Sequence, residues 1–367
     1  MTRPGDSPVP GSIPQDDLDT SDDLVVVKGL VVRFGGTGPR VLGRRPPAVQ
    51  AVRGVSFTIA RGETLGLVGE SGSGKSTTGR ALVQLHRPSS GSVLLDGEEL
   101  TKLHGRRLRD RRKRMQMIFQ DPYGSLDPQM RIRDIVAEPL YVHGLFRGAA
   151  ALEHVDELLE TVGLSPTVAD RYSGELSGGQ RQRVGIARAL AVEPDFIVAD
   201  EPTSALDVSV QAQIVRLMRR LQGERGLTYL FISHNLAVVR TLSDRIAVMY
   251  AGRIVEVLRA ADLNEHAMHP YTRELIAAVA VLDPRVERER INLARAANGS
   301  VAPPDRSLLP VDISHGCSFR SRCPYATQLC SEEDPPLRPI TPDHAVACHY
   351  AEEVAASAGP LNIREPA

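Results

Sequence analysis

The stretch from Leu65 to Thr78 constrains this chain most strongly, and it reads Leu-Gly-Leu-Val-Gly-Glu-Ser-Gly-Ser-Gly-Lys-Ser-Thr-Thr. Its apolar start predicts a buried strand that breaks at Gly69, and a helix is expected from about Lys75. The spacing Gly-x4-Gly-Lys-Ser is that of the phosphate-binding loop, in which backbone N–H groups surround a polyphosphate at a helix N-terminus. A plain Gly/Ser turn would not need Lys75 and Ser76 in this order. We therefore expect the chain to bind a nucleoside triphosphate.

The residue types of this loop match its chemistry. Glycine at positions 72 and 74 lets the backbone bend until successive N–H groups point into one concavity. Lys75 can reach the β- and γ-phosphates, and the Ser76 hydroxyl can bind Mg²⁺. The loop residues predicted to contact the nucleotide are Gly69, Glu70, Ser71, Gly72, Ser73, Gly74, Lys75, Ser76 and Thr77.

Length and charge limit the remaining possibilities. A chain of 367 residues suggests two or three domains, and its formal net charge of −1 lacks the electrostatic footprint of a nucleic-acid binder. The longest apolar run, Leu275 to Leu282, is far shorter than the roughly 20 residues of a membrane-spanning helix. The N-terminus has no apolar segment typical of a secretion signal. We expect a soluble, intracellular chain that reaches a membrane only through partners.

Composition predicts a disordered acidic tail over residues 1–23, and we expect a nucleotide-binding domain (24–262) and a C-terminal extension (263–367) to follow it. A strand is expected over Leu24–Val27, and Leu30–Phe34 is expected to continue it after a turn at Gly29. Helical periodicity runs from Ile132 to Gly163.

A second motif lies 120 residues beyond the loop, where Phe196 to Ala199 is apolar and Asp200 and Glu201 follow. Ligands of open α/β sheets bind at the carboxyl ends of the strands, so Asp200 is placed to hold Mg²⁺ directly or through water. The neighbouring Glu201 is then free to act as a base. A solvated acid at a strand end remains the simpler alternative for Glu201.

Four further motifs complete a familiar order. Gln120 follows an apolar strand, Leu176-Ser-Gly-Gly-Gln180 precedes a helix, Ser204-Ala-Leu-Asp207 precedes another, and His234 follows a strand. Together with the two motifs above, they resemble the ATPase subunits of ABC transporters over roughly residues 24–260. This resemblance implies an α/β fold, namely an ABC ATPase cassette with a mixed-sheet core and a helical subdomain, plus a small C-terminal cysteine-containing module.

The resemblance extends to one branch of that family. Phe119-Gln-Asp-Pro-Tyr-Gly-Ser-Leu-Asp-Pro128 and His269-Pro-Tyr-Thr272 are similar to the forms found in peptide/nickel importers. The implied function is ATP hydrolysis that energises import of oligopeptides or dipeptides. The implied partners are a second homologous ATPase chain, two transmembrane permeases and, indirectly, an extracytoplasmic solute-binding protein. The chain would then lie at the cytoplasmic face of the cell membrane.

The resemblance also implies a division of catalytic roles. Glu201 would orient and deprotonate the attacking water, His234 would contact the γ-phosphate, and Lys75 and Gln120 would complete the catalytic set. Mg²⁺ would be held by Ser76, Gln120 and Asp200. The residues that would act in trans, on nucleotide held by the other chain, are Ser177, Gly178, Gly179, Gln180 and Asp207.

Members of the family usually stack adenine on an aromatic residue of the first strands. Phe34 is the candidate here, and an ordinary core position is an equally good interpretation of this residue.

All four cysteines, Cys317, Cys323, Cys330 and Cys348, lie close to one another in the sequence. Cytosolic disulfides are rare, and zinc sites favour shorter spacings than these. Four thiolates can hold an iron–sulfur cluster, and the resemblance implies a [4Fe–4S] cluster here. Zinc is the alternative metal, with His315, His344 and His349 as further ligands, and scattered free thiols are a third interpretation. The expected role is structural, separate from the ATP chemistry.

Other functions fit less well. A soluble ABC ATPase of DNA repair or translation would generally carry two cassettes or a long coiled coil, which this chain lacks. A redox regulator built on the cysteines, and import of nickel or another solute, are further alternatives. Residues 106–114 hold seven basic side chains, and a solvated helix face explains them better than nucleic-acid binding in a neutral chain.

Overall fold

The computed structural model describes residues 22–35, 49–121, 124–146, 148–278 and 315–358. The predicted acidic tail up to residue 21, the charged stretch 283–300 and the Pro-rich stretch 301–310 lie outside them. Among the described residues, no helix combines the length and the apolar character that crossing a bilayer requires.

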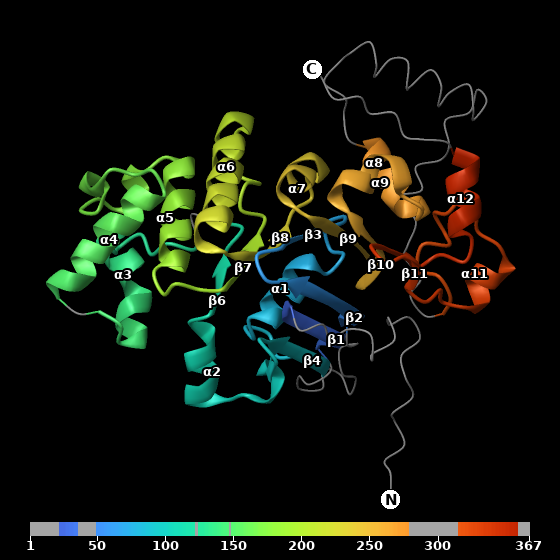
Figure 1. Ribbon diagram of the computed structural model, residues 1–367, viewed down its shortest axis with the longest axis horizontal. Helices are drawn as coiled ribbons and strands as arrows, with labels where there is room; N and C mark the ends of the chain where they lie inside the picture. The colour runs from blue at the N-terminus through green and yellow to red at the C-terminus, as the bar shows by residue number, and fades with distance from the viewer. Residues whose placement is uncertain (1–21, 36–48, 122–123, 147, 279–314, 359–367) are drawn as a thin grey trace, which may run out of the picture.

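An eight-stranded sheet with the strand order β11-β12-β10-β9-β3-β8-β7-β6 forms the centre of the molecule (Figure 1). Three of its parallel strands are buried along their whole length and mostly apolar, and the fourth, at the edge, is half-buried at Gln116, as expected where helices or a second sheet cover both faces. These neighbouring parallel strands are β3 (Thr64–Val68), β8 (Thr228–Ile232), β7 (Phe196–Asp200) and β6 (Met115–Ile118). Their carboxyl ends therefore meet along one edge of the sheet.

A predicted hairpin continues this sheet. β9 (Arg245–Tyr250) pairs with β3 in parallel, and β10 (Arg253–Arg259) returns antiparallel to β9. Ala251 and Gly252, both with positive φ, make the tight turn between them. The sequence pattern of Arg245–Tyr250 and Ile254–Val257 predicts this hairpin, and the prediction is confirmed.

A second, antiparallel sheet has the order β2-β1-β4-β5. Its strands are β1 (Asp23–Phe34), β2 (Val49–Ala60), β4 (Ser90–Leu95) and β5 (Glu98–Glu99). Helix α1 (Lys75–Leu82) lies between the two sheets, and its Ala81 and Leu82 belong to the apolar core that joins them.

β1 runs through Gly29 as one strand, so the predicted continuation over Leu30–Phe34 is confirmed, whereas the predicted turn at Gly29 is wrong. The register of β1 against β2 shifts between Val27 and Leu30, and Gly29 has φ 57°. The Gly29 N–H donates to Ser56 Oγ at 2.9 Å. The glycine thus makes a bulge that the neighbouring strand stabilises, rather than a chain reversal.

Helices cover the other face of the large sheet and share a second apolar core with it (Figure 1). The helical stretch 132–163 is interrupted at Gly144, which caps the first helix with φ 67°. The helices on this side are α3 (Ile132–His143), α4 (Ala149–Thr161), α5 (Gly178–Leu190), α6 (Val208–Arg225), α7 (Leu236–Leu242), α8 (Leu263–His266) and α9 (Pro270–Ala278). The basic stretch forms α2 (Gly105–Arg112), of which only Leu108 is buried.

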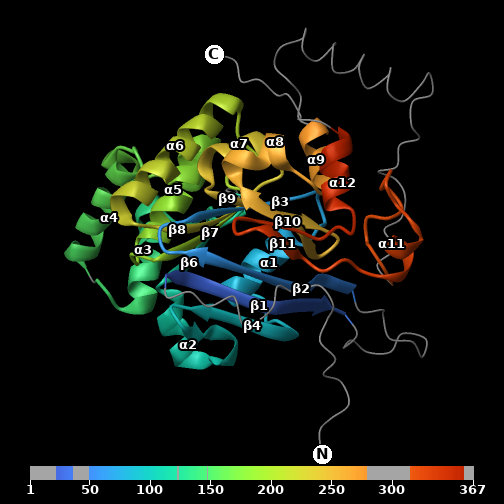
Figure 2. The ribbon, with the colours of Figure 1, turned by 45° about the vertical axis from the view of Figure 1, so that its right-hand side comes forward.

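Residues 315–358, here called the C-terminal segment, extend the large sheet past β10 (Figures 1 and 2). The segment contains α11 (Gln328–Glu332), β11 (Arg338–Thr341), β12 (His344–Val346) and α12 (Ala351–Ala358). β12 pairs antiparallel with β10, and the Ala347 N–H donates to the Val255 carbonyl at 2.8 Å. His344 on β12 also contacts the buried Glu256 of β10 at 2.8 Å. The segment is therefore continuous with the sheet that carries the nucleotide motifs.

Candidate functional site

The predicted site residues follow the carboxyl ends of four neighbouring parallel strands. The phosphate-binding loop follows β3, Gln120 follows β6, Asp200 ends β7 and His234 follows β8. This is the edge at which open α/β sheets bind ligands.

The phosphate-binding loop requires glycine for two separate reasons. Gly69, Gly72 and Gly74 all have positive φ, which side chains other than glycine rarely adopt. A Cβ at Gly69 would collide with the Met249 carbonyl oxygen, and one at Gly74 with that of Ala51. The loop is therefore wedged between β2 and the β9–β10 turn.

Lys75 lies inside this loop and is 4% exposed. Its Nζ donates to the carbonyl oxygens of Gly69 at 2.7 Å and Glu70 at 2.8 Å. Burial lowers the pKa of the Lys75 ammonium, while the Glu201, Asp200 and Glu70 carboxylates oppose that shift. A cation held here would meet the phosphates of a nucleotide in the loop.

Ser76 and Asp200 form the second part of the site. The Ser76 hydroxyl donates to Asp200 Oδ1 at 2.7 Å, and Arg80 Nη2 lies 3.8 Å from Oδ2. Asp200 is fully buried, which raises the pKa of its carboxyl, while the hydrogen bond from Ser76 and the charge of Arg80 lower it. Asp200 Oδ2 is buried without a hydrogen-bond partner. A hydroxyl beside a carboxylate with a spare oxygen is a donor set that suits Mg²⁺.

The Glu201 carboxylate contacts residues of two other predicted motifs. Gln120 Nε2 donates to Glu201 Oε2 at 3.0 Å, and His234 Nδ1 lies 3.3 Å from the same oxygen. The backbone of Glu201 has φ 46°, a conformation that is costly for a residue with a side chain. Its N–H donates to the Ile232 carbonyl at the end of β8, which holds that conformation in place.

The Leu176–Gln180 stretch begins α5 with a capping box. Ser177 Oγ accepts from the Gln180 N–H at 3.3 Å, and Gln180 Oε1 accepts from the Ser177 N–H at 2.9 Å. A Cβ at Gly178 or Gly179 would press on Leu206 or Val210 respectively. In the part of the chain that the structure describes, no hydrogen bond or ion pair joins this stretch to the phosphate-binding loop of the same chain.

Asp207 caps α6, with Oδ1 accepting from the Val210 N–H at 2.9 Å and the Ser209 hydroxyl at 2.6 Å. The Ser209 hydrogen bond lowers the pKa of the Asp207 carboxyl. A capping carboxylate of this kind orders the start of α6 beside the α5 cap.

Phe34 ends β1 and is 41% exposed, with its ring edge-on to His86 at a centroid distance of 5.3 Å. It pairs with Val49 of β2, two residues before Ala51, whose carbonyl faces Gly74. This position leaves part of the ring accessible on strands that border the loop, and adenine stacking stays a prediction.

The four cysteines lie in the C-terminal segment and form no disulfide. The Cys317 N–H donates to the Cys330 carbonyl at 2.8 Å. Burial raises the pKa of the Cys317 thiol to about 12, and the charges of Cys330, Cys323 and Cys348 add to that shift, so the four sulfurs share one neighbourhood. Across the described ranges, however, no three Cys, His, Asp or Glu side chains are grouped so as to hold a metal ion. His344, a possible zinc ligand, instead contacts Glu256.

Two residues at the site were missed by sequence reasoning. Arg80, on α1, approaches Asp200, and its place after the loop carried no motif. The Tyr271 hydroxyl accepts a hydrogen bond from the Glu70 N–H at 2.8 Å, 201 residues away. The His269–Thr272 motif signalled that this stretch mattered but not that it touches the loop.

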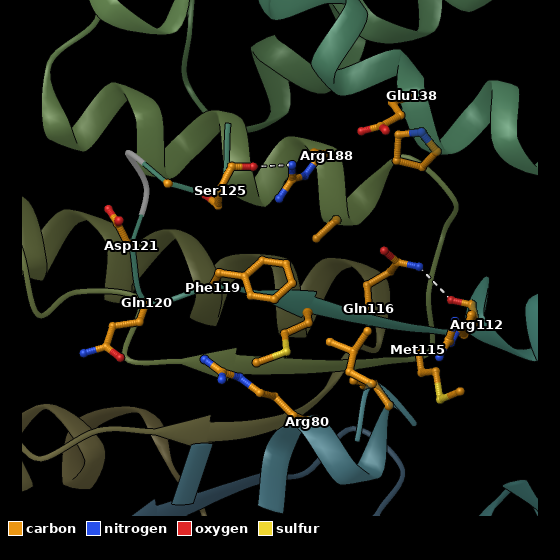
Figure 3. Close-up of a pocket in the computed structure, with 16 residues that line it drawn as sticks. Arg80, Arg112, Met115, Gln116, Phe119, Gln120, Asp121, Ser125, Glu138 and Arg188 are labelled. Atoms are coloured by element: carbon orange, nitrogen blue, oxygen red, sulfur yellow. Dashed lines mark hydrogen bonds between the residues drawn. The ribbon is translucent and has the colours of Figure 1, made fainter. Parts of the chain in front are cut away.

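A cavity of about 700 Å³ opens beside Gln120, between β6 and the helices α3 and α5 (Figure 3). Phe119 and Met117 contribute apolar surface, and Arg80, Arg112 and Arg188 contribute charge. Arg188 donates to the Ser125 carbonyl at 2.7 Å across this cavity. The cavity thus lies between Gln120, at the edge of the sheet that carries the predicted site residues, and the helices α3 and α5.

Two family models match separate parts of the chain. Residues 52–204 match the family described as "ABC transporter". Residues 255–330 match "Oligopeptide/dipeptide transporter, C-terminal region".

Curated relatives match most of the chain. The oligopeptide transport ATP-binding protein AppF of Bacillus subtilis is 48% identical over 309 residues, which cover 83% of this chain and 91% of AppF. The oligopeptide transport ATP-binding protein OppF of the same organism is also 48% identical, over 83% of this chain and 92% of its own length.

Solved structures match the fold. The dimeric bacterial ABC transporter cassette MJ0796 has a TM-score of 0.57 and 30% identity, over 64% of this chain and 98% of that one. The cbiO1 subunit of an ABC transporter complex from Clostridium perfringens has a TM-score of 0.59 and 26% identity, over 73% of this chain and 98% of that one.

Proposed function

Because this chain belongs to the ABC transporter ATP-binding proteins of the oligopeptide/dipeptide branch, we propose that it hydrolyses ATP to energise peptide import through partner permeases. The observation that carries the ATPase part is the convergence of Lys75, Ser76, Asp200 and Glu201 at one sheet edge. The peptide part rests on relatives named for peptide transport and on the matched C-terminal region.

The chain's own side chains divide the work at this site. Lys75 and the N–H groups of the loop bind the triphosphate, and Ser76 and Asp200 would hold the magnesium ion. Mg²⁺ supplies charge neutralisation to the phosphates when it is bound with them. Glu201 accepts a proton from the attacking water, while Gln120 and His234 fix the direction of its carboxylate.

A second ATPase chain supplies the remaining contacts in this proposal. The α5 N-terminus presents Ser177 and two glycine N–H groups that are not used by the loop of the same chain, and a helix N-terminus favours an anion. The structure of the cassette MJ0796 is dimeric, which supports a paired arrangement for this chain. In this proposal the second chain is a homologous subunit, and Asp207 of this chain lies at the interface between the two.

We place the permeases at the cavity beside Gln120 (Figure 3). Gln120 lies on its rim and also donates a hydrogen bond to Glu201. A movement of a permease in the cavity would therefore be transmitted to the Glu201 carboxylate through the Gln120 side chain. This arrangement puts the chain at the cytoplasmic face of the membrane, with two permeases and, beyond them, a solute-binding protein.

For the cysteines, we propose an iron–sulfur cluster as the occupant, with zinc as the alternative. Four thiols in one neighbourhood, all carried by a short segment, have the donor chemistry for either. The thiols must turn toward a common centre to act as ligands, because they are not grouped in that way.

The decisive experiment is purification of the tagged full-length chain from solubilised membranes of its own cell. Two polytopic membrane proteins and a second ATPase should co-purify. Recovery with ribosomes or DNA instead would favour the repair or translation alternative. Uptake of radiolabelled trialanine and of radioactive nickel, compared with and without this chain, separates peptide import from nickel import, and Lys75→Ala serves as the inactive control.

A further inference from the structure

Arg322, in the C-terminal segment, reaches across to the phosphate-binding loop. Its Nη1 donates to Glu70 Oε2 at 2.9 Å and its Nη2 donates to Glu70 Oε1 at 2.8 Å. Such a two-pronged pair fixes the direction of both side chains. Nη2 also donates to Glu274 of α9, so one guanidinium joins three segments of the chain.

The guanidinium is enclosed. The Arg322 side chain is 3% exposed, and its Cζ lies 5.5, 5.8 and 6.0 Å from the ring centroids of Phe319, Tyr250 and Tyr271. These three rings also pack on one another. Rings around a cation restrict its motion and favour its charge, so Arg322 has little freedom to leave Glu70.

Glu70 is therefore held at both ends by residues outside the loop. Its carboxylate binds Arg322, and its N–H donates to the Tyr271 hydroxyl at 2.8 Å. Its carbonyl oxygen in turn accepts from Lys75 Nζ at 2.8 Å. A continuous path of short contacts thus runs from the C-terminal segment to the lysine that meets the phosphates.

We propose that Arg322 is a positioning residue of the ATP site: by fixing Glu70 it sets the conformation in which the phosphate-binding loop receives the nucleotide. The inference rests on the proposed ATP-binding function. It departs from the expectation that the cysteine-bearing tail is separate from ATP chemistry, because Arg322 immediately precedes Cys323. Whatever the cysteines bind, the segment contributes to nucleotide affinity.

The test is to titrate the full-length chain with MgADP and to measure the affinity by isothermal titration calorimetry. Arg322→Gln and Glu70→Gln should each weaken binding about tenfold, a typical coupling between distant groups. The double variant should be no weaker than the weaker single variant, because both changes break the same contact. Arg322→Lys keeps the charge but not the two-pronged geometry and should recover part of the loss.

Arg338→Gln is the matched control, since Arg338 pairs with Glu352 within the C-terminal segment and away from the loop. It should bind MgADP as the wild type does. Unchanged affinity in Glu70→Gln, or losses that add in the double variant, would overturn the inference. Failure of the wild type to bind MgADP would instead count against the proposed function.

Arg322→Gln removes a buried charge and risks unfolding the protein. A second measurement therefore uses Glu70→Gln, because the Glu70 side chain is 43% exposed. Coupling is reciprocal, so MgADP should slow protease cleavage within residues 315–358 of the wild type. It should protect Glu70→Gln much less. Equal protection of both proteins would contradict the inference.

Discussion

The Ser76 hydroxyl and Asp200 Oδ1 lie 2.7 Å apart, although 124 residues separate them in the sequence. This hydrogen bond joins the first turn of α1 to the end of β7. Ser76, which follows Lys75, is thereby held against the buried Asp200 carboxylate. Glu201, the next acid along the chain, instead contacts Gln120 and His234. The two acids therefore have different surroundings and can take different roles.

Replacing Glu201 by Gln should preserve nucleotide affinity but lower ATP turnover by roughly 10²–10⁴-fold, the usual contribution of a general base. Gln is nearly isosteric, so Gln120 and His234 keep a partner while the proton acceptor is lost. Steady-state phosphate release from the assembled complex measures turnover, and size-exclusion chromatography with ATP should show a trapped dimer. Glu224→Gln, a change at an exposed acid of α6, is the control. Near-normal hydrolysis by Glu201→Gln would falsify the base assignment.

Replacing Ser177 by Arg should damage the ATP site of the partner chain and spare the site of this one. Among the described residues, no hydrogen bond or ion pair joins the α5 N-terminus to the loop of the same chain, and an Arg there would block the approach of another chain's nucleotide. Complexes in which only one subunit is mutated separate the two sites by photo-crosslinking of labelled ATP. Lys75→Ala should show the reverse pattern. A dilute monomer that hydrolyses ATP at the rate of the complex would rule the shared site out.

The stability of the fold should decrease with acid because of His269. Burial lowers the pKa of this imidazole to about 4, against the attraction of Glu256, and its Nδ1 accepts from the Tyr271 N–H at 3.0 Å. The unfolded chain binds a proton near pH 6.5, whereas the folded chain does not until about pH 4. The free energy of unfolding therefore falls as the pH drops through this interval, by about 2 kcal/mol between pH 7 and pH 5.

Urea unfolding at these two pH values, compared between the wild type and His269→Gln, isolates the contribution of His269. The variant is expected to lose about 2 kcal/mol of the pH dependence, whatever its overall stability. An identical pH dependence in both proteins would contradict this account.

If the cysteines hold a [4Fe–4S] cluster, anaerobically purified protein should be brown and absorb at about 400 nm. It should contain about four iron and four sulfide per chain. Serine at Cys330, which is buried, should remove the colour. Colourless protein with one equivalent of zinc would exclude the iron–sulfur version. Four freely alkylated thiols in active, metal-free protein would exclude both metals.

The fold and the arrangement of the ATP motifs were largely predictable, because each motif follows the end of a buried apolar strand. Parallel strands align their carboxyl ends, so Gln120, Asp200 and His234 had to meet near the loop once the strands were identified. The capping box at Ser177 was likewise predictable, since it depends only on residues three apart.

Contacts between distant segments were not predictable in the same way. Gly29 looked like a turn because its bulge is stabilised by Ser56, on another strand. Arg322 gave no local signal at all, since its role depends on a fold that brings residues 70, 271 and 322 together. Periodicity and spacing describe neighbours in the sequence, whereas these interactions are created by closure of the whole sheet.

The pairing of β10 with β12 has a consequence for synthesis of the protein. β10 leaves the ribosome well before β12, so the nascent chain carries an open strand edge that could recruit another chain. Glu256 stands on that strand, and a charge on an open edge discourages incorrect pairing. In the folded protein the N–H groups of Met268 and His269, which follow β10 in the chain, donate to this carboxylate, and His344 contacts it once β12 has paired with β10. Glu256 would thus disfavour incorrect strand pairing during translation and then bind His344 of β12, the strand that covers the open edge of β10.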